Sequence, residues 1–415
     1  MHFRQSLLPA QRAHLDDANF LVPLIQGFAG AVTLSPTRLP GNQQQQTSLA
    51  LISRLGWKRA GARFRTRGVD DDGNVANFVE TETILAMDDV VMSFLQVRGS
   101  VPLFWEQVGN QTFGQKLQIT RPQAASQPAF DKHFLDLIDH YGSVHCINLL
   151  GQGENETILS DIYNAHVASL STTLRSSDRT VNSMTGEKET LVSLTPYDFH
   201  AMVRVSGHDV VKEDFGKRIA SVRNAREKYG WNVIDRASGD VVMRQSGVFR
   251  VNVSVRDGAA GGRSTGADQG SHYGSKVPGL VSRRHQSRTS GALTVDCNLP
   301  TRSLDRTNYV EDVFSSLTIS SFLASLGHSS TSAYSASAII LSAHRGLWAD
   351  NGDALSKIYA GTGALNTSVT RSGKRSFASL ISDASKSVGR AIQATFNDSD
   401  KQASIELFLV RINRG

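Results

Sequence analysis

A short polar run, Leu304-Asp305-Arg306-Thr307-Asn308, opens a stretch with helical spacing and is the part of the sequence best suited to bind phosphate. A phosphate dianion is held by backbone N–H groups at the start of a helix and by a guanidinium group that donates two hydrogen bonds. Arg306 can supply the guanidinium group, and the predicted helix can supply the N–H groups. The same residue types also form an ordinary helix N-cap, so the run alone fits either interpretation.

Catalysis at such a site requires a nucleophile. A cysteine thiolate near a helix start and an arginine has a lowered pKa and can attack phosphorus. In cysteine-dependent phosphatases it stands six positions before the arginine, where this chain has Pro300. Cys146 lies in an apolar run and is predicted to be a buried core thiol, whereas Cys297 lies near Arg306. Cys297 is therefore either a displaced nucleophile or an inert loop residue.

The segments around these residues predict an α/β domain. Phe130–Tyr141 and Glu154–Ser169 have helical spacing and flank Val144–Leu150, a short apolar run typical of a buried strand. Gly247–Asn252 is predicted to be a strand that runs toward a loop. This order predicts a mostly parallel sheet flanked by helices.

Outside that layer the periodicity changes. Met1–Val32 is predicted to be helical, and Asn77–Thr83 and Ser93–Arg98 alternate as in a small antiparallel sheet. Helical spacing returns in Asn308–Leu326 and Ser335–Asp350. We expect the first eighty to a hundred residues to extend the main domain.

Composition narrows the classes of function. The chain has 415 residues, 40% of them hydrophobic, and a net charge of +6 that favours an anionic partner. Zinc spacing, an RNA-binding aromatic signature and a helix-turn-helix pattern are all missing from the sequence, so we expect no nucleic acid partner. Its apolar passages are shorter than a bilayer span, and two distant cysteines favour a reducing compartment. Residues 253–296 are rich in Gly, Ser and Arg and are predicted to be disordered.

The chain resembles the Sac phosphoinositide phosphatase family, which includes the Sac lipid phosphatases and the amino-terminal domain of synaptojanins. The resemblance reaches to about Gln393 and follows the family's order over five segments: Arg63–Glu82, Gln96–Trp105, Asp198–His200, Gly247–Arg250 and Leu347–Ala364. The family signature is Arg-x-Asn-Cys-x-Asp-Cys-x-Asp-Arg-Thr-Asn, whose first Cys is the nucleophile and whose last Arg binds phosphate.

That signature is interrupted in this chain. Phe249–Asn252 matches its left edge and Leu304–Asn308 its right edge, but residues 253–303 separate them and Val253 stands where the nucleophile should follow. Such an insertion disrupts the loop unless it bulges outward while its ends close, which is conceivable because loop entropy grows slowly with length. An unremoved intron in the gene model is another explanation.

The single cysteine in the inserted stretch leaves two readings open. Asp296-Cys297 can represent the Asp-Cys of the signature, or Cys297 can be a displaced nucleophile before a shortened loop at Arg302-Ser303.

The basic cluster around Arg65 and Arg67 suits an anionic headgroup, although alternating arginines also occur on solvated strand faces. Asp350–Asp353 is predicted to form a polar turn close to the site.

The resemblance implies an enzyme that hydrolyses the 3- or 4-phosphate of phosphatidylinositol phosphates through a cysteinyl-phosphate. The implied catalytic residues are Cys297, Asp305, Arg306 and Thr307, and the implied substrate-binding residues are Arg250, Asn252, Asn308, Arg65 and Arg67. We expect no metal or cofactor. The alternative is an inactive phosphoinositide-binding pseudophosphatase.

The resemblance also implies an organisation and a setting. Residues 1–396 would form the catalytic region without the amino-terminal Sac module, residues 253–296 a disordered insertion, and residues 397–415 a tail. The protein would be cytoplasmic, without a transmembrane segment, and peripheral on endoplasmic reticulum, Golgi or endosomal membranes. Its partners would be phosphoinositide lipids at the cytosolic surface.

Overall fold

A computed structural model describes the positions of part of the chain. The described residues are 10, 25–38, 44–61, 66–108, 116–151, 154–177, 189–253, 303–326, 331–365, 367–372, 386 and 401–405. Cys297, Arg65 and the predicted disorder beyond Val253 lie outside these ranges.

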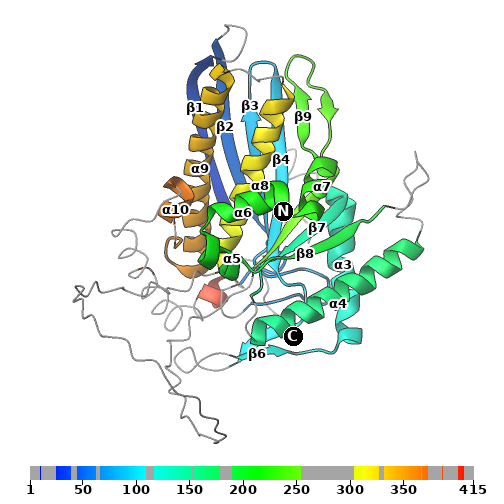
Figure 1. Cartoon of the computed structure of the whole chain (residues 1–415). Coiled ribbons are helices and arrows are strands. Elements are labelled where there is room, and N and C mark those ends of the chain that lie inside the picture. Colours follow the sequence, from blue (N-terminus) through cyan, green and yellow to red (C-terminus); the bar gives the residue numbers. More distant parts are fainter. Residues whose placement is uncertain are drawn as a thin grey trace, which may run out of the picture.

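A mixed sheet forms the centre of the described structure (Figure 1). Its main path runs in the order β1-β2-β3-β4-β11-β7-β8. The antiparallel strands are β1 (Gly27–Arg38), β2 (Gln44–Leu55), β3 (Val79–Ala86) and β4 (Val90–Ser100). The strands parallel to β4 are β11 (Gly247–Val253), β7 (Ser143–Asn148) and β8 (Val192–Pro196). β4 thus joins an antiparallel arm to a parallel core.

This architecture confirms the predicted α/β class with a mostly parallel core. All six residues of β7 are buried, as expected for a strand covered by helices on both faces. The predicted antiparallel strands do form, but they continue the same sheet instead of making a separate one. The helix predicted for Met1–Val32 is wrong over Gly27–Val32, which belongs to β1, because pairing with β2 overrides the local pattern.

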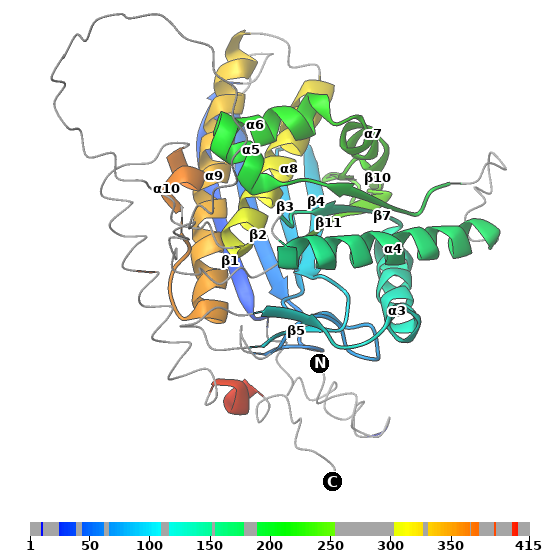
Figure 2. The ribbon, with the colours of Figure 1, turned by 60° about the horizontal axis from the view of Figure 1, so that its bottom comes forward.

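Helices cover both faces of the sheet (Figure 2). One face carries α3 (Gln123–Tyr141) and α4 (Glu154–Ser176). The other carries α8 (Ser303–Ser325), α9 (Thr331–Ala360), α5 (Phe199–Ser206), α6 (Asp209–Glu213), a π-helical turn (Asp214–Arg218) and α7 (Ala220–Tyr229). Smaller elements are the hairpins β5 (Trp105–Val108) with β6 (Lys116–Ile119) and β9 (Asn232–Asp235) with β10 (Val241–Met243), and α10 (Thr367–Ser372).

Alternate side chains of β11 separate two cores. Phe249 joins the core under α8, where its ring stacks on Phe314 with a centroid distance of 4.2 Å. Val248 joins the core under α3 and α4. This alternation fixes the position of α8 relative to the carboxyl end of β11. In the described part of the chain, no helix is both long and apolar enough to span a membrane.

Candidate active site

The carboxyl ends of β7 and β11 carry two asparagines that bond to each other. The Asn252 side-chain amide donates to Asn148 Oδ1 at 2.8 Å, and Asn252 Oδ1 accepts from the backbone N–H of Leu149 at 3.3 Å. Both asparagines are 1% exposed. Ligands of open α/β sheets bind beyond the carboxyl ends of parallel strands, so this edge is the natural place for a site.

Arg306, in the first turns of α8, reaches the same edge. Its Nη1 donates to the backbone carbonyl of Leu149 at 3.2 Å, and its side chain is 1% exposed. Asn252 and Arg306 stand 54 positions apart in the sequence, yet both bond to Leu149. The two edges of the interrupted signature therefore meet at one point of the fold.

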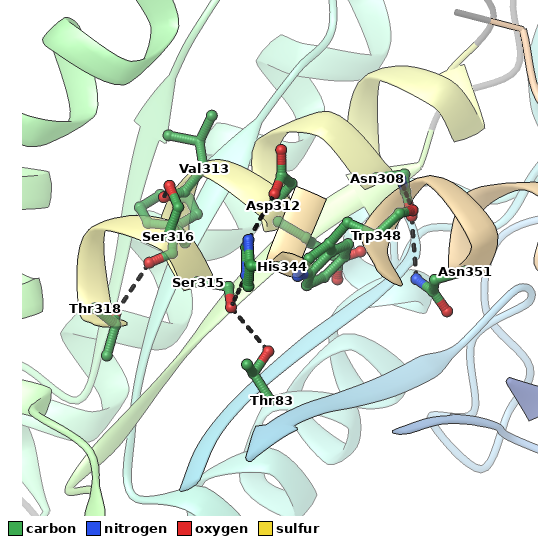
Figure 3. A network of polar contacts seen from close by, with 12 residues as sticks. Thr83, Asn308, Asp312, Val313, Ser315, Ser316, Thr318, His344, Trp348 and Asn351 are labelled. Atoms are coloured by element: carbon green, nitrogen blue, oxygen red, sulfur yellow. Dashed lines mark hydrogen bonds and ion pairs between the residues drawn. The ribbon is translucent and has the colours of Figure 1, made fainter. Parts of the chain in front are cut away.

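The residues that follow Arg306 are tied to α9 (Figure 3). Asn308 Nδ2 donates to the backbone carbonyl of Trp348 at 3.0 Å, and Asn351 Nδ2 donates to Asn308 Oδ1 at 3.1 Å. Thr307 is fully buried. Asn308 thus links the start of α8 to α9, and these two bonds use one N–H donor and one lone pair of its amide.

The polar turn predicted at Asp350–Asp353 is wrong, because these residues lie inside α9. The Asn351 bond to Asn308 and the burial of Leu355 against Val79 keep the helix going through Gly352. Proximity to the site is nevertheless correct for Asn351. Asp353, two positions further along α9, holds the segment that follows the helix, because its carboxylate accepts a hydrogen bond from the Ala364 N–H at 2.7 Å.

Two acidic residues near this edge were not among the predicted site residues. Glu156 is buried and its Oε2 accepts from the Gly151 N–H at 2.7 Å, which closes the loop after β7. A side chain at position 151 would meet Glu156 Oε2 at 2.8 Å, so Glu156 would have to shift from its bond to the Gly151 N–H. Asp198 caps α5 by accepting from the Ala201 N–H at 3.0 Å. A glycine at the end of the apolar run was the only sequence signal for this loop.

Arg250 lies on the other face of β11 from Phe249 and points into the core. It is fully buried, its Nε donates to His133 Nε2 at 3.0 Å, and its Nη2 donates to the Ser100 carbonyl at 2.7 Å. Burial and the Arg250 charge hold the pKa of His133 well below its usual value, so the imidazole stays neutral and can accept this bond. These contacts give Arg250 a structural role behind the site.

Arg67 is also engaged within the fold. Its Nη2 donates to Gln107 Oε1 at 2.8 Å, and its guanidinium carbon lies 5.7 Å from the centre of the Trp105 ring. It is 6% exposed and therefore does not form the solvated strand face that an alternating pattern would suggest. Both of these side-chain contacts are with residues of β5.

Of the two remaining catalytic candidates, Cys297 lies outside the described residues and Asp305 is placed only by its backbone, which belongs to α8. The other cysteine, Cys146, is fully buried in β7, and burial raises the pKa of its thiol, which confirms the predicted core thiol. Among the described residues, no three His, Cys, Asp or Glu side chains are grouped so that they could hold a metal ion.

One buried ion pair lies beside the site, between β4 and α8. Arg98 Nη1 and Glu311 Oε2 are 3.5 Å apart, with side chains 1% and 0% exposed. Burial raises the pKa of Glu311 from 4.5 to about 7, since the loss of hydration outweighs the attraction of Arg98.

The raised pKa predicts a pH-dependent stability. The neutral Glu311 carboxyl stabilises the fold fully below its ordinary pKa near 4.5, and this contribution is lost as the pH rises through about 7. Between pH 4.5 and 7 the unmodified chain should therefore lose about 3 kcal/mol of unfolding free energy relative to Glu311→Gln. Urea unfolding of both proteins across this pH range measures the difference, and parallel curves would contradict it.

Comparisons of the sequence with known proteins identify relatives of this chain. The model of the SacI homology domain matches residues 2–204. The chain is 36% identical over 410 residues to inositol-1,4,5-trisphosphate 5-phosphatase 1 of Schizosaccharomyces pombe, which covers 99% of this chain and 30% of that protein. It is 33% identical over 398 residues to a polyphosphatidylinositol phosphatase of Saccharomyces cerevisiae, covering 96% of this chain and 30% of the relative.

A third similarity is to synaptojanin-1 of Rattus norvegicus, with 34% identity over 371 residues, 88% of this chain and 18% of that protein. The chain thus spans less than a third of the length of each of these three relatives. Each similarity covers most of this chain, including both edges of the site described above.

Proposed function

This chain belongs to the Sac-domain phosphoinositide phosphatase family, and on that premise we propose that it hydrolyses the 3- or 4-phosphate of phosphatidylinositol phosphates. The observation that carries the proposal is the meeting of Asn252 and Arg306 at Leu149. A phosphate loop needs its two ends within bonding reach of one another, and here they are in reach although residues 253–303 intervene.

The proposed site binds the substrate phosphate at the start of α8. Arg306 holds the non-bridging oxygens, and the N–H groups of the first helical turn add the positive end of the helix dipole. These groups also stabilise the extra negative charge of the transition state, which is the main source of rate in such sites. Arg250, whose side chain extends from β11 into the core, supports the end of this strand through His133 and Ser100.

The proposed reaction has two displacements on phosphorus. The Cys297 thiolate forms a bond to phosphorus while the bond from phosphorus to the inositol oxygen breaks, and Asp305 supplies the proton to that oxygen. Water then attacks the cysteinyl-phosphate, the sulfur leaves as thiolate, and inorganic phosphate is released. Thr307 assists this second step. No metal or cofactor takes part in either step.

Position 253 supports one alternative. The backbone of Val253 continues β11 directly after Asn252, so valine occupies the place where the family's nucleophile follows. A chain that binds phosphoinositides with Arg306 but cannot form a cysteinyl-phosphate would be an inactive binding module. Direct measurement of turnover separates the two.

The test is phosphate release from a panel of short-chain phosphoinositides. We expect release from the 3- and 4-monophosphates, and release from the 5-monophosphate slower by about tenfold or more, the discrimination that a few misplaced hydrogen bonds produce. Binding of the monophosphates without release would establish the inactive module. Preferential release of the 5-phosphate would contradict the proposed specificity, and neither binding nor release would overturn the function.

The proposed cellular location also follows from the family and from the charge of the chain. A net charge of +6 favours contact with the anionic cytosolic leaflet, which would place the protein peripherally on endomembranes of the endoplasmic reticulum, Golgi or endosomes. Its partners there would be phosphoinositide lipids and no nucleic acid. Sedimentation with vesicles that contain or lack phosphatidylinositol 4-phosphate measures this binding.

A further inference from the structure

The face of α8 that packs on β3, β4 and α9 is polar, although the helix is buried there. Its four polar residues lie within two turns and are at most 6% exposed: Asn308, Glu311, Asp312 and Ser315. A helix face buried in a core is ordinarily apolar. The exception therefore calls for a physical reason.

Every one of these four side chains has a partner on another element. Asn308 bonds to Trp348 and Asn351 of α9, and Glu311 pairs with Arg98 of β4. The backbone carbonyl of Glu311 also accepts from Gln96 Nε2 at 2.9 Å. The helix is thus held by polar contacts along two neighbouring elements.

Asp312 and Ser315 join a chain of contacts through α9 to β3 (Figure 3). His344 Nδ1 lies 3.2 Å from Asp312 Oδ1, and His344 Nε2 lies 2.7 Å from Ser315 Oγ. Ser315 Oγ also lies 2.8 Å from Thr83 Oγ1 on β3. The order Asp, His, Ser is that of a hydrolase triad, but Asp312 Oδ1 and His344 Nδ1 do not form a hydrogen bond, and Ser315 Oγ is enclosed between His344 and Thr83. We therefore assign these residues to the packing of the helix and not to catalysis.

Stability alone does not explain such a face. Buried ion pairs and polar networks are about as stable as, or less stable than, apolar residues of the same shape, because their desolvation offsets their attraction. What they add is discrimination, since a polar group displaced from its partner is left buried without one. An apolar helix can also pack one turn away, about 5.4 Å along its axis, whereas this helix has one acceptable position.

The position of α8 decides where Arg306 lies. Arg306 is the fourth residue of the helix, and its bond to the Leu149 carbonyl is 3.2 Å long. A shift of about 1 Å in a positioning group costs about 10²-fold in rate. A small slide of α8 would therefore disable the proposed phosphate site without unfolding the protein.

We propose that the buried polar contacts of α8, with Arg98–Glu311 at their centre, form a register lock that positions Arg306. The lock consists of Glu311, Asp312 and Ser315 on the helix and of Arg98, His344 and Thr83 on the elements around it. Its effect on helix position stands on the contacts alone. Its effect on phosphate binding rests on the function proposed above.

The test replaces the central ion pair by apolar residues of similar size, Arg98→Met with Glu311→Leu, in the full chain. The matched control is Ser53→Ala with Thr81→Val, which removes another fully buried polar pair, 2.9 Å apart, that joins β2 to β3 without touching α8. Two readouts are compared: hydrogen exchange of the backbone amides of residues 306–308, and the dissociation constant of inorganic phosphate.

The lock variant should melt at the same or a higher temperature than the unmodified chain, yet exchange faster at residues 306–308 and bind phosphate at least about tenfold more weakly. The control should change neither readout. Unchanged exchange and binding in a folded lock variant would overturn the lock. Phosphate binding by no protein in the set would instead refute the proposed function, while the exchange result would still decide the lock.

A milder pair of variants covers the case in which the lock variant does not fold. Thr83→Val removes a hydroxyl that contacts Ser315 of α8, and Thr81→Val removes a hydroxyl that contacts Ser53 of β2. Both residues are on β3 and fully buried. Thr83→Val alone should raise exchange at residues 306–308, and equal exchange in the two variants would overturn the lock.

Discussion

Arg306→Ala is expected to lower the kcat/KM for phosphatidylinositol 4-phosphate by about 10³-fold, the loss seen when one preorganised donor to a developing charge is removed. Arg306 is the side chain of the helix start that reaches the carboxyl edge of β7 and can donate two parallel bonds to a phosphate. Arg306→Lys keeps the charge but not the fork of donors, so it should recover only part of the activity. Initial rates with a short-chain substrate measure both.

The control is Arg371→Ala. Arg371 is exposed and pairs with Asp350 at 2.6 Å, so its loss removes the same charge without touching the site. Thermal unfolding of each variant separates loss of activity from loss of fold, since Arg306 also satisfies the Leu149 carbonyl. Activity of a folded Arg306→Ala protein within about threefold of the control would show that another group binds the phosphate.

The parallel core could be predicted from the sequence because burial on both faces leaves a short continuous apolar run, as in Val144–Leu150. The amino-terminal strand β1 could not be predicted in this way. Gly27–Val32 belongs to a stretch with helical spacing, and its pairing with Leu49–Arg54 makes it a strand. The sheet supplies those partners, and no local pattern contains them.

The residues of the candidate site also divide into those that could be predicted from the sequence and those that could not. Arg306 could be found because its local motif is suited to phosphate binding, and Asn252 because it stands at the left edge of the family signature, but neither pattern indicates that the two residues meet. Arg98 and Glu311 could not be paired in advance, because 213 positions separate them and neither residue type is expected in a core. Long-range partners of this kind appear only when the fold is known.

The nucleophile gives the last prediction and the largest expected effect. Of the two cysteines, Cys146 is fully buried within β7 and burial raises the pKa of its thiol, so it cannot supply a thiolate to a substrate. A cysteine mechanism therefore requires Cys297, which precedes Arg306 by nine positions instead of the family's six. Cys297→Ser should lower kcat by about 10⁴-fold or more, as loss of a nucleophile does.

Cys146→Ala is the matched control, because it removes the other thiol from the core and should reduce stability while leaving kcat within about twofold. Acid quenching with radiolabelled substrate should trap phosphate on the unmodified chain and on Cys146→Ala, but none on Cys297→Ser. An active Cys297→Ser protein would refute the cysteinyl-phosphate at this position. An inactive unmodified chain that regains activity when residues 253–303 are replaced by an uninterrupted family loop would show that the insertion, and not the fold around Leu149, prevents catalysis.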